Sequence, residues 1–230
     1  AESLTLGVPG IASSSEVPYW RFDLPEGGAL TITAENEVAD PLITLFDASG
    51  AWVAENDDAI GLNSRLDLAD PLPPGSYCIA VQALSDASAP ITLKVGDFDA
   101  TGAMQVQFET GNMAPPLDGS YPVINAGSLQ TRLRQDAMID GATTWFSFDV
   151  PEYGLVVVEA IAASEGGDPH LVLFDDLGRK LTENDDTGEG LDSMVAARLN
   201  RGTYLFGVKD IASSAPVPVR LALERFVPAE

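Results

Sequence analysis

Apolar and polar residues alternate along most of this chain, in short runs that Gly, Pro, Asn or Asp interrupt at intervals of roughly eight to twelve residues. Examples are "ALTITA" (29–34) and "ITLKV" (91–95). Because successive side chains of a β-strand point to opposite faces of its sheet, this alternation predicts strands with one buried face and one outer face. No segment sustains the apolar repeat of roughly 3.6 residues that predicts a helix. The pattern therefore predicts an all-β protein built from β-sandwiches.

The same ordered set of motifs occurs twice in the chain. "YWRFDLPE" (19–26) matches "WFSFDVPE" (145–152), and "DPLITLFD" (40–47) matches "DPHLVLFD" (168–175). Each copy continues with "ENDD", then with "GLNS" or "GLDS", and then with "PGSYCIAV" or "RGTYLFGV". The copies lie 126 to 129 residues apart. This spacing is that of a whole domain and exceeds the period of roughly 20 to 50 residues in solenoid repeats.

The repeat predicts two domains, residues 1–110 and residues 123–230. Residues 111–122 are rich in Pro, Gly and Asn and show no periodicity, so we interpret them as a linker. In each copy, the strand of the "WRFDL" type carries its large side chains on one face, which we predict to be core. The core residues predicted in this way are Trp20, Phe22, Leu24, Phe146, Phe148 and Val150.

Aromatic residues also lie on the opposite face of these strands. Tyr19 and Trp145 occupy equivalent positions there, and Trp52 follows the first predicted hairpin turn. Exposed aromatic rings can stack on sugars or contact extended chains, so these three residues are candidate ligand-binding residues. The alternative is that the rings cover an interface between the two domains, because large apolar patches are seldom left open.

The first copy places acidic residues at the open end of a predicted hairpin, whose turn is "DASG" (47–50). If the hairpin closes with a two-residue loop, Asp40 lies opposite Asp57. If it closes with a glycine bulge, Asp40 lies opposite Asp58. Like charges directly opposite each other destabilise a sheet by roughly 0.2 to 1 kcal/mol, so the occurrence of this arrangement in both copies suggests a compensating cation.

The second copy repeats the arrangement with the same 17-residue spacing, so that Asp168 lies opposite Asp185 or Asp186. Oxygen ligands without His or Cys suit calcium, which takes about 6 to 8 oxygens, including those of Asn. The alternative is that "ENDD" is a solvated turn that a duplication preserved. The predicted calcium ligands are Asp40, Asn56, Asp57, Asp58, Asp168, Asn184, Asp185 and Asp186. Asn63 and Asp192 in the following loops either complete the shell or cap a turn.

A second string that resembles a calcium-binding loop is "DFDATGAMQVQFE" (97–109). Asp97, Asp99 and Gly102 stand as in an EF-hand loop, but Phe108 occupies the twelfth position, where that loop needs Glu. We therefore predict a plain turn at this place.

The charge of the chain excludes some partners. It has 35 Asp or Glu residues against 12 Lys or Arg, and a formal net charge of −23. Such a chain repels nucleic acid phosphates and anionic lipid, so we expect no nucleic acid partner. No run approaches the roughly 20 apolar residues of a bilayer span, so we expect no membrane insertion. The single Cys78 allows no intrachain disulfide.

Catalytic motifs are weak in this sequence. The one histidine, His170, lies within a predicted strand, where its counterpart in the first copy is Leu42. The serines lack a "GxSxG" elbow, and no glycine-rich phosphate loop occurs. Paired carboxylates suffice for some hydrolases, but here the acids concentrate in the repeated hairpin ends. We therefore predict that the protein is not an enzyme.

The ordered motifs resemble the bacterial pre-peptidase C-terminal (PPC) domain. In the first copy the resemblance rests on "YWRFDLPEGGALTI", "DPLITLFDASGAWVAENDD" and "PPGSYCIAV", and in the second on "WFSFDVPEYGLVVV", "DPHLVLFDDLGRKLTENDD" and "RGTYLFGV". The resemblance implies two tandem jelly-roll-like β-sandwich domains, related to collagenase collagen-binding domains. It also implies a non-catalytic appendage of exported bacterial proteins, of which some members bind calcium. The chain departs from the family in having no peptidase, and in "LDSMVAARL", which replaces the more family-like "LNSRLDL".

These observations leave three hypotheses for function. The first is a secreted or periplasmic binding or accessory protein that calcium stabilises, and we expect "AESLTLGVPG" to be a mature end left by signal cleavage. The second is a module that binds carbohydrate or a matrix protein through exposed aromatic residues. The third, and least favoured, is a carboxylate-based hydrolase. The expected partner is a glycan or an extracellular protein, and the sequence predicts no particular oligomeric state.

Overall fold

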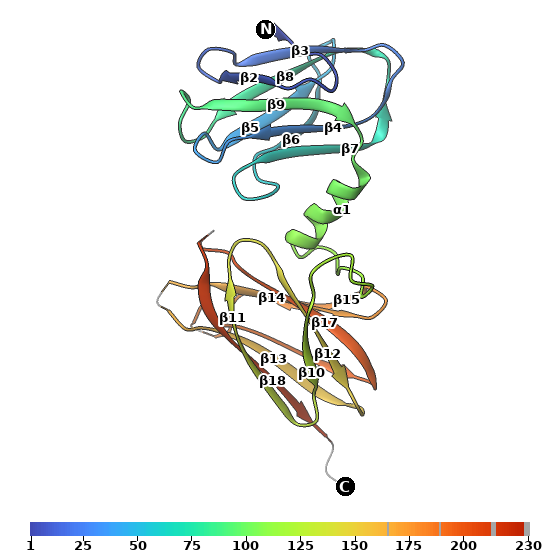
Figure 1. Cartoon of the computed structure of the whole chain (residues 1–230), viewed down its shortest axis with the longest axis vertical. Coiled ribbons are helices and arrows are strands. Elements are labelled where there is room, and N and C mark those ends of the chain that lie inside the picture. Colours follow the sequence, from blue (N-terminus) through green and yellow to red (C-terminus); the bar gives the residue numbers. More distant parts are fainter. Residues whose placement is uncertain (165, 189, 213–214, 228–230) are drawn as a thin grey trace. The chain divides into compact units, whose positions relative to one another are not determined.

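The computed structural model describes residues 1–164, 166–188, 190–212 and 215–227. The chain divides into two compact units, residues 1–106 and residues 107–230 (Figure 1). Residues 228–230, the end of the predicted second domain, lie outside the described residues. In the part of the chain that is described, no helix has the length and apolar character needed to cross a membrane.

The first unit is a β-sandwich of two sheets. Its five-stranded sheet has the order β1-β3-β8-β5-β6, and its four-stranded sheet has the order β2-β9-β4-β7. Apart from the parallel pair β1 and β3, neighbouring strands are antiparallel. The strands are β1 (Glu2–Ser3), β2 (Gly10–Ser13), β3 (Tyr19–Leu24), β4 (Gly28–Glu35), β5 (Pro41–Phe46), β6 (Trp52–Asn56), β7 (Ser64–Leu72), β8 (Gly75–Ala83) and β9 (Pro90–Asp97).

The second unit repeats this architecture strand for strand. Its sheets have the orders β10-β12-β17-β14-β15 and β11-β18-β13-β16, in which every strand has a counterpart at the same place in the first unit. The prediction of an all-β chain with two tandem sandwiches is confirmed. The strands are β10 (Ile124–Ser128), β11 (Arg132–Ile139), β12 (Thr144–Val150), β13 (Gly154–Ala162), β14 (Pro169–Asp175), β15 (Lys180–Asn184), β16 (Ser193–Leu199), β17 (Gly202–Asp210) and β18 (Val217–Phe226).

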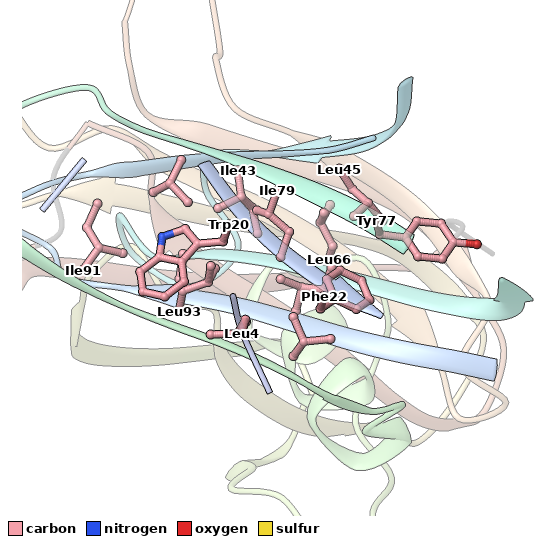
Figure 2. Close-up of a cluster of buried hydrophobic side chains, with 14 of the residues drawn as sticks. Leu4, Trp20, Phe22, Ile43, Leu45, Leu66, Tyr77, Ile79, Ile91 and Leu93 are labelled. Carbon is pink, nitrogen blue, oxygen red and sulfur yellow. The ribbon is translucent and has the colours of Figure 1, made fainter. Parts of the chain in front are cut away.

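The core of each sandwich contains the residues that the alternation predicts. Figure 2 shows Trp20 and Phe22 of β3 in one cluster with Leu66 and Leu93, which come from the opposite sheet. In the second unit, the equivalent side chains of β12 lie in a cluster with residues of both sheets. The predicted core positions are all buried: Trp20, Phe22, Leu24, Phe146, Phe148 and Val150.

The prediction of a plain turn at residues 97–109 is wrong, because Ala100–Glu109 forms the helix α1. Asp99 precedes the helix as its N-cap, and its Oδ1 accepts a hydrogen bond of 2.9 Å from the Gly102 amide. Its side chain also forms an ion pair with Arg65 of β7, at 3.4 Å. The apolar periodicity of the segment is weak, so the sequence pattern does not predict the helix, which begins after the Asp99 cap.

Both registers predicted for the first hairpin are wrong. The pairing of β5 with β6 shifts by one residue at Val53, and beyond this bulge Ile43 lies opposite Asn56. In this register Asp40 is not directly opposite either aspartate of "ENDD". The physical reason is that Val53 packs partly buried against the core, which favours the extra residue in β6.

The second hairpin requires the same correction. The register of β14 and β15 shifts at Leu181, and beyond the shift Leu171 lies opposite Asn184. Asp168 is therefore not directly opposite Asp185 or Asp186. The acids still lie at the open end of each hairpin, because they directly precede the first strand and directly follow the second.

An aspartate side chain organises the turn of each hairpin. In the second unit, Asp175 is buried, and its Oδ1 accepts hydrogen bonds from the amides of Leu177 and Arg179, at 3.1 and 2.9 Å. Its Oδ2 accepts a bond of 2.7 Å from Nε of Arg179. In the first unit, Asp47 takes the same place and accepts from Ser49 and Ala51.

We expect Asp175→Ala to lower the free energy of unfolding of the second unit by about 1–2 kcal/mol at neutral pH. Burial raises the pKa of Asp175, but the hydrogen bonds from the Arg179 amide and guanidinium and from the Leu177 amide outweigh it, so the pKa lies below its ordinary value. The carboxylate therefore stabilises the fold above its ordinary pKa of about 3.9, and this contribution is lost as the pH falls through the lowered pKa.

Urea unfolding of wild type and variant at about pH 7 and about pH 3 measures this difference. The stabilities should converge at the lower pH, whereas Asp176→Ala, at the neighbouring exposed position, should match wild type at both. A difference that is undiminished at low pH would show that the effect of Asp175 is not electrostatic.

Candidate functional site

Three aspartates gather at the open end of the first hairpin. Asp40 directly precedes β5, and Asp57 and Asp58 directly follow β6. Burial raises the pKa of Asp58, and the charges of Asp57 and Asp40 raise it further. The charges of Asp57 and Asp40 are therefore close enough to Asp58 to disfavour its charged form.

Asp40 is held in place by its backbone. Its φ of 55° lies in the left-handed region, where Asp and Asn are enriched among non-glycine residues. Its amide donates to the carbonyl of Asn36 at 3.0 Å, and its carbonyl accepts from the Leu84 amide at 2.8 Å. Its Oδ2 accepts a bond of 3.3 Å from the Ser85 hydroxyl. The Asp40 side chain therefore extends from a backbone position that hydrogen bonds hold in place.

The second unit has a denser version of this cluster. Burial raises the pKa of Asp168, and the charges of Asp186, Asp210 and Asp185 add to the effect. Oδ1 of Asp168 is buried and has no hydrogen-bond partner within the described part of the chain. A buried carboxylate oxygen without a hydrogen-bond partner disfavours the charged form of the residue, in agreement with the raised pKa of Asp168.

Asp210 is a residue that the sequence reasoning missed. It is 2% exposed, and its Oδ2 accepts a bond of 2.9 Å from the Asp168 amide. Asp210 lies opposite Pro169, whereas the first unit has Ala83 opposite Pro41. The available signal was the end of the repeated strand, where "AVQA" in the first copy becomes "GVKD" in the second.

The two predicted asparagine ligands have backbone partners in the structure. Oδ1 of Asn56 accepts from the Arg65 amide at 2.9 Å. Oδ1 of Asn184 accepts from the Met194 amide at 3.4 Å. Buried serines reinforce both loops, since Ser64 donates to the carbonyl of Asn56 and Ser193 to that of Asn184. These contacts fix the loops that carry the neighbouring aspartates.

Asn63 and Asp192 also have equivalent contacts. Oδ1 of Asn63 accepts from the Asn36 amide at 2.9 Å. Oδ1 of Asp192 accepts from the Ala162 amide at 2.9 Å. Each side chain therefore ties its loop to the end of the neighbouring strand, β4 or β13, which is an anchoring role.

The acidic residues are not gathered into a coordination shell. Within the described ranges, no three His, Cys, Asp or Glu side chains form a group that could hold a metal ion. What the residues offer a cation is the set of mutually repelling carboxylates and, in the second unit, the partnerless Oδ1 of Asp168.

Trp145 is not an exposed ligand-binding residue, and this prediction is corrected. The side chain is 1% exposed, packs at 5.6 Å between ring centroids against Phe174, and donates from Nε1 to the Phe108 carbonyl at 2.9 Å. It lies on the outer face of the five-stranded sheet, as the alternation predicts. That face is covered by a segment of the same unit, so the outer face is not solvent-exposed.

This covering segment comprises residues 107–123. Ala114, Tyr121 and Val123 pack against the cluster around Trp145, and Tyr121 contacts Phe108 edge-on at 5.0 Å. Residues 111–122, predicted to be a linker, thus pack as part of the second unit. Their composition disfavours helices and strands, but their apolar residues, such as Ala114 and Tyr121, pack on the cluster around Trp145.

Polar contacts also attach the covering segment to the sheet. Nζ of Lys209 donates to the Thr110 carbonyl at 3.0 Å, and the Thr143 amide donates to the Glu109 carbonyl at 2.8 Å. Burial lowers the pKa of Lys209, and the charge of Lys180 lowers it further. Burial likewise lowers the pKa of His170, the cross-strand neighbour of Lys209.

Tyr19 and Trp52 have the exposure that the sequence predicts. Tyr19 is 52% exposed and Trp52 is 64% exposed. Both lie in the five-stranded sheet of the first unit, Tyr19 at the start of β3 and Trp52 at the start of β6. They remain candidate contacts for a ligand.

No protein-family model and no curated protein matches this chain. Among solved structures, it is similar to the PPC domain of a collagenase from Bacillus anthracis, with 13% identity over 46% of this chain and 100% of that chain, and a TM-score of 0.37. PliG, a periplasmic inhibitor of g-type lysozyme from Aeromonas hydrophila, has 16% identity over 46% of this chain and 100% of its own, with a TM-score of 0.33.

A third similar structure is CorA, a surface-associated copper-binding protein from Methylomicrobium album BG8, with 10% identity over 46% of this chain and 100% of that chain, and a TM-score of 0.33. Each of these three matches has the extent of about one unit. The two β-sandwich units, which share one strand order, are consistent with the two tandem PPC-like domains that the sequence motifs predict.

Proposed function

We propose that this protein is a non-catalytic, exported binding or accessory protein, and that calcium stabilises the acidic end of each of its sandwiches. The observation that carries the proposal is the buried Oδ1 of Asp168, which has no hydrogen-bond partner among the described residues and lies near three further carboxylates whose charges raise the pKa of Asp168. The first unit has Asp40 at the equivalent position, with Asp57 and Asp58 beside it.

Calcium fits the chemistry of these residues. It takes about 6 to 8 oxygen ligands in flexible geometry, and carboxylates, backbone carbonyls and water all serve. The proposed ligands are Asp40, Asp57 and Asp58 in the first unit, and Asp168, Asp185 and Asp186 in the second. A bound ion turns the repulsion between the carboxylates into attraction, so the fold and the ion stabilise each other.

The remaining residues of the site act as supports for these ligands. Asp210 holds the Asp168 backbone, and Asn56 and Asn184 hold the loops after β6 and β15. Their contacts leave the aspartates to face the ion. Support of this kind is what orients metal ligands in proteins generally.

Two features support a non-catalytic role, and a third bears on the partner. His170 is half-buried within β14, and its lowered pKa reflects that burial rather than a catalytic pair. The aspartates occur in duplicate at hairpin ends, as repeated structural features of the two sandwiches. The net charge of −23 disfavours nucleic acid, which leaves an extracellular protein or a glycan as the proposed partner.

Calcium titration by calorimetry and by thermal unfolding tests the proposal. We expect two sites in wild type and one site in each of Asp57→Ala and Asp185→Ala. Extracellular calcium modules have dissociation constants of roughly 10⁻⁴ to 10⁻³ M. A 100-fold excess over that constant adds about 2.7 kcal/mol per site. Magnesium, which demands a tighter octahedron, should not produce this stabilisation.

Control variants separate a specific site from general charge. Asp70→Asn and Asp176→Asn remove exposed carboxylates elsewhere, and both should keep two sites. Asp168→Asn should stabilise the second unit in calcium-free buffer, because it relieves repulsion, and should make it less stable than wild type in calcium. Absence of both binding heat and thermal shift at millimolar calcium would refute the calcium proposal.

A second candidate function is carbohydrate or matrix-protein binding through exposed aromatic residues. The exposure of Tyr19 and Trp52 in one sheet favours it, while the burial of Trp145 removes the equivalent site from the second unit. Binding of this kind is thus expected to be a property of the first unit.

A further inference from the structure

A pocket opens on the five-stranded sheet of the first unit. Its volume is about 350 Å³, and its sheet-borne lining includes Tyr19, Leu42, Thr44 and Ala80. Leu42 and Thr44 alternate along β5 with the core residue Ile43, so they belong to the outer face of the sheet. The pocket is therefore a feature of the outer face and not of the sandwich core.

The second unit has an equivalent face. In the first unit, Ala80 pairs with Tyr19 on one side and with Thr44 on the other. In the second unit, Gly207 pairs in the same way with Trp145 and with Val172. The row Tyr19, Ala80 and Thr44 therefore matches the row Trp145, Gly207 and Val172 position for position. The first row is open, whereas the second is covered.

The covering segment shows how this face takes up a peptide. Trp145 and Val172 are each 1% exposed beneath it, and the Trp145 indole donates to the backbone of the segment at Phe108. The backbone at Gly111 also lies over this face, since an added Cβ would be in ordinary van der Waals contact, at 3.6 Å, with Cγ1 of Val172. The end of α1 and the irregular residues that follow it thus seal the face in the second unit.

The charges around the two faces differ. In the second unit, His170, Lys180 and Lys209 stand where the first unit has Leu42, Trp52 and Gln82. The first unit also carries sixteen Asp or Glu residues against three Lys or Arg within residues 1–106. The first unit has a cation of its own on this face, Arg21 of β3, where the second unit has Ser147. The face still lacks the three basic residues of its counterpart, and the first unit as a whole is strongly acidic, which favours a positively charged partner.

We propose that the outer face of the five-stranded sheet of the first unit binds a peptide segment of a partner protein, with an aromatic or aliphatic anchor in the pocket and Lys or Arg beside it. The proposal rests on the binding function proposed above and names the class of partner. The pocket is small for a ligand site, which suits a side-chain anchor. Backbone contacts and the anchor supply affinity, as they do for the covering segment, and the charge supplies selectivity.

The probe that tests this inference is a synthetic peptide with the sequence of residues 107–123, in which Glu109→Lys and Asp118→Lys reverse the two negative charges. Fluorescence anisotropy of the labelled probe with the full chain should show saturable binding that weakens as salt is raised. The unaltered sequence should bind more weakly than the probe, because its acidic residues are repelled.

Variants of the full chain locate the binding. Leu42→Arg fills the pocket and adds a cation, so it should weaken probe binding at least about tenfold, and Tyr19→Ala should weaken it in the same direction. The matched control is Ile11→Ser, which changes a residue that is 66% exposed in β2 of the other sheet and should leave the affinity unchanged.

Three results would overturn the inference. They are no saturable binding at millimolar probe, binding that Leu42→Arg does not weaken, and a homodimer that Leu42→Arg dissociates, which would make the face a contact between copies. Calcium titration of the same samples distinguishes failure of the peptide site from failure of the calcium proposal. A chain that binds two calcium ions but no probe overturns the peptide site alone.

Discussion

Replacement of Trp145 by alanine is expected to lower the free energy of unfolding of the second unit by about 3–5 kcal/mol. The indole is 1% exposed, and it packs with Val172, Phe174 and Leu205. Its loss removes a large buried apolar surface and leaves the Phe108 carbonyl without its 2.9 Å hydrogen bond. Both effects destabilise the sheet and the covering segment together.

Urea unfolding of the full chain measures this loss, and hydrogen exchange assigns it to the second unit, where amides of residues 107–123 should lose protection. The matched control is Tyr19→Ala at the equivalent position of the first unit. Because Tyr19 is 52% exposed, its removal should change stability by no more than about 0.5 kcal/mol. Equal losses at the two positions would contradict the distinction between a covered and an open face.

The second large effect is expected for Gly207→Val, which should destabilise the second unit by about 3 kcal/mol, the upper end of the range for overpacking. A Cβ on Gly207 would lie 2.5 Å from Cγ2 of Thr143 and 3.1 Å from Cγ1 of Val172. Thr143 is buried and has a short, branched side chain, so it has little freedom to move. The packing of Thr143 and Val172 over Gly207 therefore leaves no room for the added side chain.

The sign of this effect is informative, because valine has a higher strand propensity than glycine and would stabilise an unobstructed strand. Ala80→Val at the matched position of the first unit provides the comparison, since that position lines an open pocket. We expect Ala80→Val to stay within about 0.5 kcal/mol of wild type. If Gly207→Val were neutral or stabilising in urea unfolding, the close packing over this strand would be refuted.

These predictions share one interpretation of the duplication. Both units keep the same strand order and the same acidic hairpin ends. They differ on the outer face of the five-stranded sheet, where the second unit is sealed by its own covering segment and the first carries a pocket. The covered face adds buried apolar surface to the second unit, and binding is proposed for the open face of the first.

The sequence by itself determined the fold class and the two cores. Alternation along a strand is a local property, because neighbouring side chains point to opposite sides of the sheet whatever the rest of the chain does. Burial of one set is then required by the hydrophobic effect, so Phe22 and Phe148 could be placed in the cores directly. The repeated motifs extended this reasoning to two copies of one sandwich.

The candidate site was predictable in outline only. The acids before and after each hairpin were found from spacing, but the bulges at Val53 and Leu181 changed the register. A bulge is a local feature of how two strands pair, and the spacing of residues within a hairpin does not determine it. Asp210 lies about forty residues further along the chain from Asp168, and only the pairing of β14 with β17 brings the two together.

Whether an outer face meets solvent was decided by the tertiary structure alone. Tyr19 and Trp145 have equivalent positions in the sequence pattern, yet one ring is half exposed and the other is buried. The difference comes from residues 107–123, whose composition resembles a linker but whose Tyr121 and Val123 gain from covering the Trp145 cluster. Periodicity shows which side of a strand a residue occupies, whereas the contacts of a distant segment determine what lies on that side.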